Sequence, residues 1–171
     1  MTPTFEQNLK KYADIIVRIG INISEGDLLL LQVSLTDDPN IRTLAHLVIE
    51  AAYQAGAKYV DVNWIDATVD KLRVLNADKE TLTYVPDWNV KRLEMMADQG
   101  IARLSIRGVD PELYADVDRK KVTSMQRAGQ AALQHIVPTL MNVNKWSVAA
   151  VPVQAWADKV FADVDTAQER R

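Results

Sequence analysis

The amino-acid sequence predicts an α/β fold in which a parallel-rich sheet is flanked by helices on both faces. Four short apolar segments alternate with longer segments of helical periodicity. This order is typical of a parallel sheet, because neighbouring parallel strands need helical crossovers. The first segment, 28–33, is almost wholly apolar on both faces, as in a strand buried between two layers of helices. Residues that cap or end helices stand at the expected boundaries.

The N-terminal segment is predicted to be a helix that leads into the first strand. One apolar stripe at helical spacing consists of Phe5, Leu9, Tyr12, Ile16 and Ile19. Thr4 and Gln7 can form a capping box, and Gly20 suits a left-handed end of the helix. The turn at Gly26 and Asp27 then leads into strand 28–33.

The second strand is predicted at 59–65, after a helix that begins at Asp38 and Pro39 and ends at Gly56. Asp66 can cap the helix that follows this strand. A further helix is expected from about Pro86 to Gly100, before the third strand.

The third strand is predicted at 102–107, and the Asp110-Pro111 pair after it repeats the arrangement at Asp38 and Pro39. A long helix is expected over about 118–134, the fourth strand over 146–151 and a short helix over 154–160. We expect one α/β domain over 1–162 and a charged tail over 163–171.

Composition excludes several classes of function. The chain has no cysteine, which excludes disulfides, thiolate metal sites and cysteine nucleophiles. A net charge of -3 gives no basic footprint for nucleic acid, and no segment approaches the length of a membrane helix. The first residues lack the features of a signal peptide. We therefore expect a cytoplasmic protein with neither nucleic acid nor membrane as a partner.

Candidate site residues lie where the predicted strands end, because ligands of open α/β sheets bind at the carboxyl ends of the strands. Asp66, Arg107 and Asp110 are the candidates for a substrate cleft. Each also has a simpler interpretation, as a helix cap for the aspartates and as a surface ion pair for Arg107. Asp66 and Asp70 lie four residues apart and could share a cation, although no third ligand stands near them.

No motif of a known catalytic centre is present. The two histidines, His46 and His135, do not form a HExxH pair, and the nucleophile elbow, the P-loop and the glycine-rich dinucleotide turn are all missing. We therefore predict no catalytic or metal-binding residue in this chain. Four tryptophans, at 64, 88, 146 and 156, are predicted mainly for the core, with a dimer or interdomain surface as the alternative.

Four segments nevertheless resemble a known family in their order and spacing. They are 22–27 (NISEGD), 52–58 (AYQAGAK), 103–111 (RLSIRGVDP) and 146–152 (WSVAAVP) with 156–161 (WADKVF). Together they look like the N-terminal portion of the thermophilic-type metalloaminopeptidases, of the aminopeptidase T and aminopeptidase S type.

The resemblance implies part of a dimeric exopeptidase that removes N-terminal residues from peptides. In this family a pair of divalent metal ions (zinc, cobalt or manganese) and the catalytic residues belong to a C-terminal domain, which this sequence does not include. We therefore expect this chain alone to be inactive and to serve as a scaffold, cleft wall or dimer surface. Two alternatives stay open: a stand-alone non-catalytic relative that dimerises or binds peptides, and an unrelated α/β ligand-binding domain.

Overall fold

A four-stranded, entirely parallel sheet forms the centre of the molecule. The computed structural model describes residues 4–151 and 153–161, and the charged tail predicted at 163–171 lies outside them. The strands are β1 (Leu28–Leu35), β2 (Tyr59–Asp66), β3 (Ala102–Arg107) and β4 (Trp146–Ala150). Their order across the sheet is β2-β1-β3-β4, so β2 and β4 form its edges. The predicted fold class and all four predicted strands are confirmed, with ends that shift by at most two residues.

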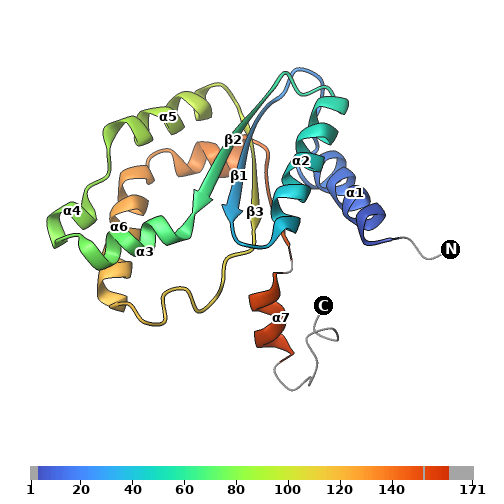
Figure 1. Ribbon diagram of the computed structural model, residues 1–171. Coiled ribbons are helices and arrows are strands. Elements are labelled where there is room, and N and C mark those ends of the chain that lie inside the picture. The colour runs from blue at the N-terminus through green and yellow to red at the C-terminus, as the bar shows by residue number, and fades with distance from the viewer. Residues whose placement is uncertain (1–3, 152, 162–171) are drawn as a thin grey trace.

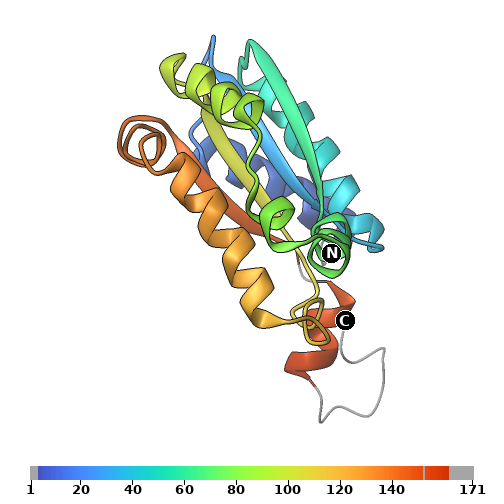
Figure 2. The ribbon, with the colours of Figure 1, turned by 90° about the vertical axis from the view of Figure 1, so that its left-hand side faces the viewer.

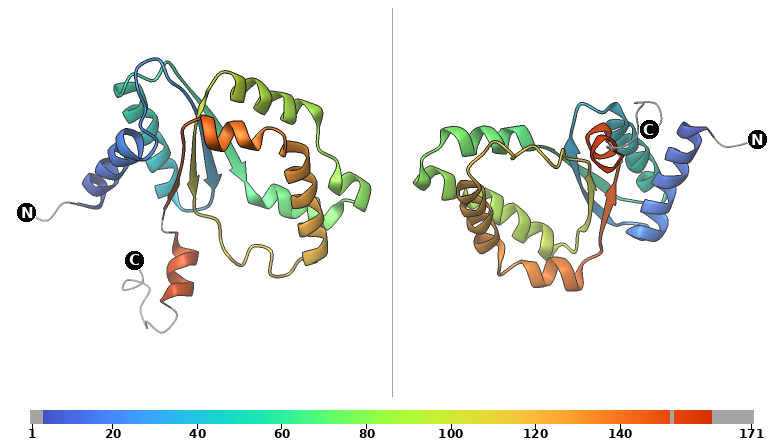
Figure 3. Two further views of the ribbon diagram at one scale, coloured as in Figure 1. Left: turned by 180° about the vertical axis from the view of Figure 1, so that it is seen from behind. Right: turned by 90° about the horizontal axis from the view of Figure 1, so that it is seen from below.

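Helices lie on both sides of this sheet (Figures 1 and 2). They are α1 (Phe5–Ile15) with the π-helical turn η1 (Ile16–Gly20), α2 (Pro39–Gln54), α3 (Ala67–Asn76), α4 (Lys79–Thr83), α5 (Asp87–Asp98), α6 (Arg119–Leu133) with the π-helical turn η2 (Thr139–Val143), and α7 (Gln154–Val160). Viewed from below, α1 and α2 stand on one side of the sheet, and α3 to α6 stand on the other (Figure 3).

The main hydrophobic core lies between the sheet and the pair α1 and α2. Every second residue of the central strands faces it, including Leu29, Leu31 and Val33 of β1 with Leu104 and Ile106 of β3. All five are essentially inaccessible to solvent. This burial is the main stabilising term of the fold, because each such side chain gains about 1.5–3 kcal/mol on leaving water.

The second layer of helices is held together by two smaller clusters. One joins Val74, Leu82 and Val117, and the other joins Ala97, Ile136 and Leu140. Helix α6 has no buried residue, although it is 15 residues long. The two sides of the sheet are therefore unequal, since the large core lies on the α1 and α2 side alone.

Local signals place most helix ends. Thr4 and Gln7 form the predicted capping box, and the side chains of Asp38 and Asp66 cap α2 and α3. Gly56 and Gly100 have positive φ angles and end α2 and α5, as predicted. Helix α4, capped by Asp78, was not predicted because five residues are too few to show a helical period.

Three predictions are wrong. Gly20 does not adopt the left-handed conformation; the helix runs through it as η1, and Asn22 has the positive φ angle, 53°. No helix begins at Pro111, because the chain forms turns there until Asp118 caps α6. The tryptophans are not mainly in the core, since Trp64, Trp88 and Trp146 are exposed and Trp156 is only half-buried.

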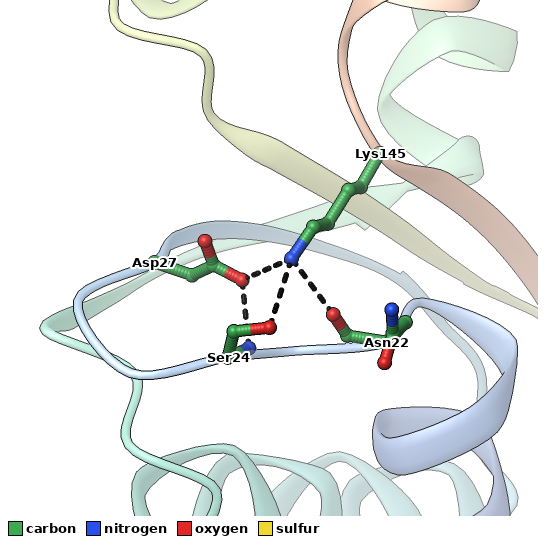
Figure 4. Close-up of polar contacts among 4 residues, drawn as sticks. All are labelled: Asn22, Ser24, Asp27 and Lys145. Carbon is green, nitrogen blue, oxygen red and sulfur yellow. Dashed lines mark hydrogen bonds and ion pairs between the residues drawn. The ribbon is translucent and has the colours of Figure 1, made fainter.

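Lys145 joins the segment before β4 to the segment before β1, at the edge of the sheet where the strands begin. Lys145 Nζ donates to the backbone oxygen of Asn22 at 2.8 Å and to Ser24 Oγ at 3.3 Å, and it pairs with Asp27 Oδ2 at 2.6 Å (Figure 4). The backbone N–H of Ser24 donates to the same carboxylate oxygen at 2.8 Å. The residues before β1 and β4 are thereby locked to each other.

Candidate functional site

Asp66 lies at the carboxyl end of β2, where the sequence places it. Its Oδ1 accepts the backbone N–H of Thr68 at 2.8 Å, so the carboxylate satisfies one of the free donors at the start of α3. Asp70 lies in the first turn of the same helix. The observed contact of Asp66 is that of a helix cap.

Arg107 is the last residue of β3, and Asp110 lies three residues after it. Asp110 Oδ1 accepts the backbone N–H of Glu112 at 2.8 Å and stabilises a turn. Arg107 is exposed, and its guanidinium makes no hydrogen bond or ion pair with any other described residue. Within residues 4–151 and 153–161, Arg107 thus has no ion-pair partner, and its role in a substrate cleft stays a prediction.

The sheet brings the three candidates to one edge without joining them. Strand β1 separates β2 from β3, so the ends at Asp66 and Arg107 stand two strand spacings apart, roughly 9–10 Å. In the described chain, no hydrogen bond or ion pair connects any two of Asp66, Arg107 and Asp110. The geometry thus supplies an edge with separate polar groups rather than a catalytic cluster.

An open hollow of about 460 Å³ adjoins this edge, between the turn after Asp110 and the start of α6. It is lined by Pro111, Glu112, Tyr114, Ala115, Arg119, Val122, Thr123 and Lys159. Lys159 pairs with Glu112 in its wall. Burial, and secondarily the charge of Asp70, raise the pKa of Tyr114 above its ordinary value. The Tyr114 hydroxyl donates to the carbonyl of Ala67 at 3.4 Å.

The side chains present do not fit a pair of divalent metal ions. Such a centre needs several carboxylate and imidazole ligands that converge, with the ions roughly 3.5–4 Å apart. Across residues 4–151 and 153–161, no three His, Asp or Glu side chains are grouped to hold even one ion. His46 is exposed on α2 and packs edge-to-face on Trp64, and His135 Nε2 pairs with Glu94 Oε1 at 2.7 Å.

The second face of the sheet carries polar residues that the sequence analysis did not single out. Asn63 of β2, Gln32 of β1 and Ser105 of β3 are direct partners in one row across the sheet. Ser105 Oγ donates to Gln32 Oε1 at 3.4 Å. Arg103 and Arg107 flank Ser105 on the same face of β3. The signal was present, because Arg103, Ser105 and Arg107 alternate with buried residues at the period of a strand.

Over the described residues, none of the helices is long and apolar enough to cross a membrane.

Comparison with known proteins gives one consistent result. Residues 5–171 match the family model of the thermophilic metalloprotease (M29). The chain is 35% identical to aminopeptidase 2 of Geobacillus stearothermophilus over 161 residues, and 33% identical to aminopeptidase PepS of Streptococcus thermophilus over 168 residues. These matches cover 94% and 98% of this chain, but 38% and 40% of the two relatives.

The fold also matches a solved structure. Wild-type AmpT from Thermus thermophilus superimposes with a TM-score of 0.85 at 25% sequence identity, over 98% of this chain and 41% of that chain. The chain thus spans about two-fifths of the length of these relatives, and nearly all of it is used in each match.

Proposed function

Because this chain belongs to the thermophilic metalloprotease (M29) family, we propose that it is the N-terminal α/β domain of a metal-dependent aminopeptidase that removes N-terminal residues from peptides. The observation that carries the proposal is the match of nearly the whole chain to about 40% of proteins that are themselves called aminopeptidases. The role proposed for this domain is that of scaffold, cleft wall or dimer surface in a cytoplasmic enzyme.

The metal-ligating side chains of this chain support the role of a domain without the metal centre. The two histidines of the chain lie far apart in the sequence. His46 is in α2, and His135 is in the turn after α6, where it pairs with Glu94. We therefore assign the two divalent ions of the complete enzyme, and the residues that hold them, to the part of the aminopeptidase relatives that this chain does not cover. The contribution of this chain is to shape and support the substrate site.

Exposed apolar side chains support a contact surface. Trp146 and Val148 are 46% and 53% exposed on the edge strand β4, and Val160 and Phe161 at the end of α7 are 71% and 48% exposed. Large apolar side chains that are exposed in this way are typical of surfaces that another domain or subunit covers. They also favour the second candidate function, a stand-alone relative that dimerises or binds peptides.

A chimera tests the proposal. The segment of Geobacillus stearothermophilus aminopeptidase 2 that this chain matches is replaced by this chain, and hydrolysis of a leucine-coupled fluorogenic amide is measured with zinc, cobalt or manganese. We expect activity that a chelator abolishes. The control is the same relative with an unrelated α/β domain of similar length in that place, which should be inactive. A chimera that folds and binds metal but has no turnover would contradict the proposal.

Sedimentation of the 171-residue chain separates the two candidates. A chain that forms a stable dimer and binds peptides by itself favours the stand-alone relative. A weakly associating chain, together with an active chimera, favours the domain of a larger enzyme.

A further inference from the structure

The second face of the sheet is unusual for a parallel sheet. Parallel strands are commonly buried on both faces by helices and are apolar on both sides. Here the face that points toward α3 to α6 carries four half-buried polar residues, Gln32, Asn63, Arg103 and Ser105, beside one fully buried apolar residue, Leu30. The helices on this side pack into their own two clusters instead of covering the sheet with a large apolar core.

Arg103 is a half-buried charged group on this face that has no hydrogen-bond or ion-pair partner among the described residues. Its cross-strand neighbours are Leu30 on β1 and Trp146 on β4, neither of which is charged. Its Nε is buried and without a hydrogen bond in the described chain. Desolvation lowers the pKa of Arg103, but a guanidinium keeps its charge at physiological pH. Arg103 is half-buried, its Nε has no hydrogen-bond partner, and no anion stands beside it among the described residues, so this position favours a negatively charged ligand.

The neighbouring polar groups also have unused hydrogen-bonding capacity. Asn63 makes no side-chain hydrogen bond with any described residue, and Gln32 uses only its oxygen, toward Ser105. The row that these residues form lies two residues along the strand from Arg103, roughly 6.6 Å away. That spacing lets one ligand place a carboxylate on the guanidinium and an amide group on the row.

The charge of the face favours an anion as well. Asp61 is its one acidic residue in the described chain, and Arg92 Nη2 neutralises it at 2.6 Å. Arg103 and Arg107 stay without a counter-charge among the described residues. A planar guanidinium fork matches a carboxylate in two parallel hydrogen bonds, which an ammonium group cannot reproduce.

We propose that the polar face of the sheet binds the carboxylate of a peptide, with Arg103 on the carboxylate and Asn63, Gln32 and Ser105 on the adjoining amide groups. The inference rests on the proposed aminopeptidase function, which supplies short peptides as the ligand class. It adds that this domain recognises the end of the peptide remote from the bond that is cut.

The test is binding of peptides to the 171-residue chain, measured by NMR titration. The probes are tetraalanine with a free carboxyl end, the same peptide amidated, and an amidated peptide with one internal glutamate. We expect the free acid to bind at least about tenfold more tightly than the amidated tetraalanine, because one charge-assisted contact is lost. Binding of the glutamate peptide as tightly as the free acid would overturn recognition of the peptide end. Equal affinity of all three peptides would overturn the proposal.

Variants assign the effect to Arg103. Arg103→Gln should lower the affinity for the free acid at least about tenfold and leave that for the amidated peptide unchanged. Arg42→Gln is the matched control, since Arg42 is an exposed arginine on α2, on the other side of the sheet, and it should change neither affinity. If Arg103→Gln does not fold, the Arg103 Nε–H resonance of the unmodified chain decides: it must shift with the free acid and not with the amidated peptide.

The outcomes separate this inference from the proposed function. An active chimera together with no Arg103-dependent binding would overturn the carboxylate site alone. An inactive chimera together with Arg103-dependent binding of the free acid would overturn the aminopeptidase assignment alone.

Discussion

Lys145 Nζ lies 2.6 Å from Asp27 Oδ2, across 118 residues of sequence. The pair is partly shielded, with the two side chains 38% and 26% exposed, and the same ammonium group also binds the backbone oxygen of Asn22 (Figure 4). Because Asn22 has a positive φ angle, 53°, the lysine also holds a backbone conformation that non-glycine residues rarely adopt. One side chain therefore fixes the segment before β1 to the segment before β4.

Lys145→Met should lower the free energy of unfolding by about 1–2 kcal/mol, because it removes charge-assisted hydrogen bonds at a half-shielded site. Urea denaturation measures the change. The control is Lys159→Met, which removes an ion pair with Glu112 whose side chains are more than half exposed. That control should change stability by less than about 0.5 kcal/mol. Equal changes in the free energy of unfolding would show that the Lys145 contacts stabilise the fold no more than an exposed ion pair does.

Gly56→Ala should lower the free energy of unfolding by about 2–4 kcal/mol. Gly56 has a φ of 98°, and a Cβ at this position would lie 2.8 Å from the backbone Cα of Glu25. Both the strain and the overlap act on backbone, which cannot move aside as a side chain can. Gly129→Ala is the control: its Cβ would meet nothing within 4 Å in α6, so it should stabilise by up to about 1 kcal/mol. Thermal unfolding of both variants checks the opposite signs.

Lys71→Met should raise the pKa of Asp116 toward its ordinary value. Lys71 Nζ lies 2.6 Å from Asp116 Oδ1, and this contact is the largest cause of the lowered pKa of that carboxyl group. The backbone N–H of Thr81 lowers the pKa of Asp78 independently, so Asp78 serves as the internal control and should not change. Carboxyl-carbon NMR titrations of both residues measure the effect.

The same lowered pKa values set the direction of the pH dependence. A carboxyl group whose pKa is lower in the folded state stabilises the fold fully above its unfolded pKa and loses this contribution as the pH falls through the folded value. The contributions of Asp78 and Asp116 should therefore be present at neutral pH and disappear below about pH 4. A melting temperature that rises on acidification through this range would contradict the assignment.

The isolated chain should show no aminopeptidase turnover with zinc, cobalt or manganese. A metal-bound hydroxide near neutral pH requires a fixed cation with an open coordination position. Residues 4–151 and 153–161 offer no group of three ligands for one. Release of a fluorophore from a leucine-coupled amide by the purified chain, with a chelator control, measures this. Sustained chelator-sensitive release would mean that Asp66, Asp70 and the strand-end loops form a metal site.

The candidate site was only partly predictable. Asp66 and Asp110 were found because they follow apolar strands, and their capping and turn contacts are local, within two residues. The pair His135–Glu94 and the row Asn63–Gln32–Ser105 were missed. Neighbours in these groups are separated by 31 to 73 residues along the chain, with Gln32 and Ser105 the farthest apart. They meet only because whole helices and strands pack together. No local pattern specifies which helix end meets which helix.

The sequence by itself determined the parallel α/β class, the four strands and most helix ends, because these follow from side-chain periodicity and from caps such as Thr4, Asp38 and Asp66. Only the tertiary structure decided that β1 lies between β2 and β3, that one face of the sheet receives the large core, and that Arg103 on the other face has no partner among the described residues. The physical reason is that hydrophobic burial is not directional. It rewards any arrangement that hides the apolar stripes, so the final order of strands and the polar groups left over depend on how all the elements pack together.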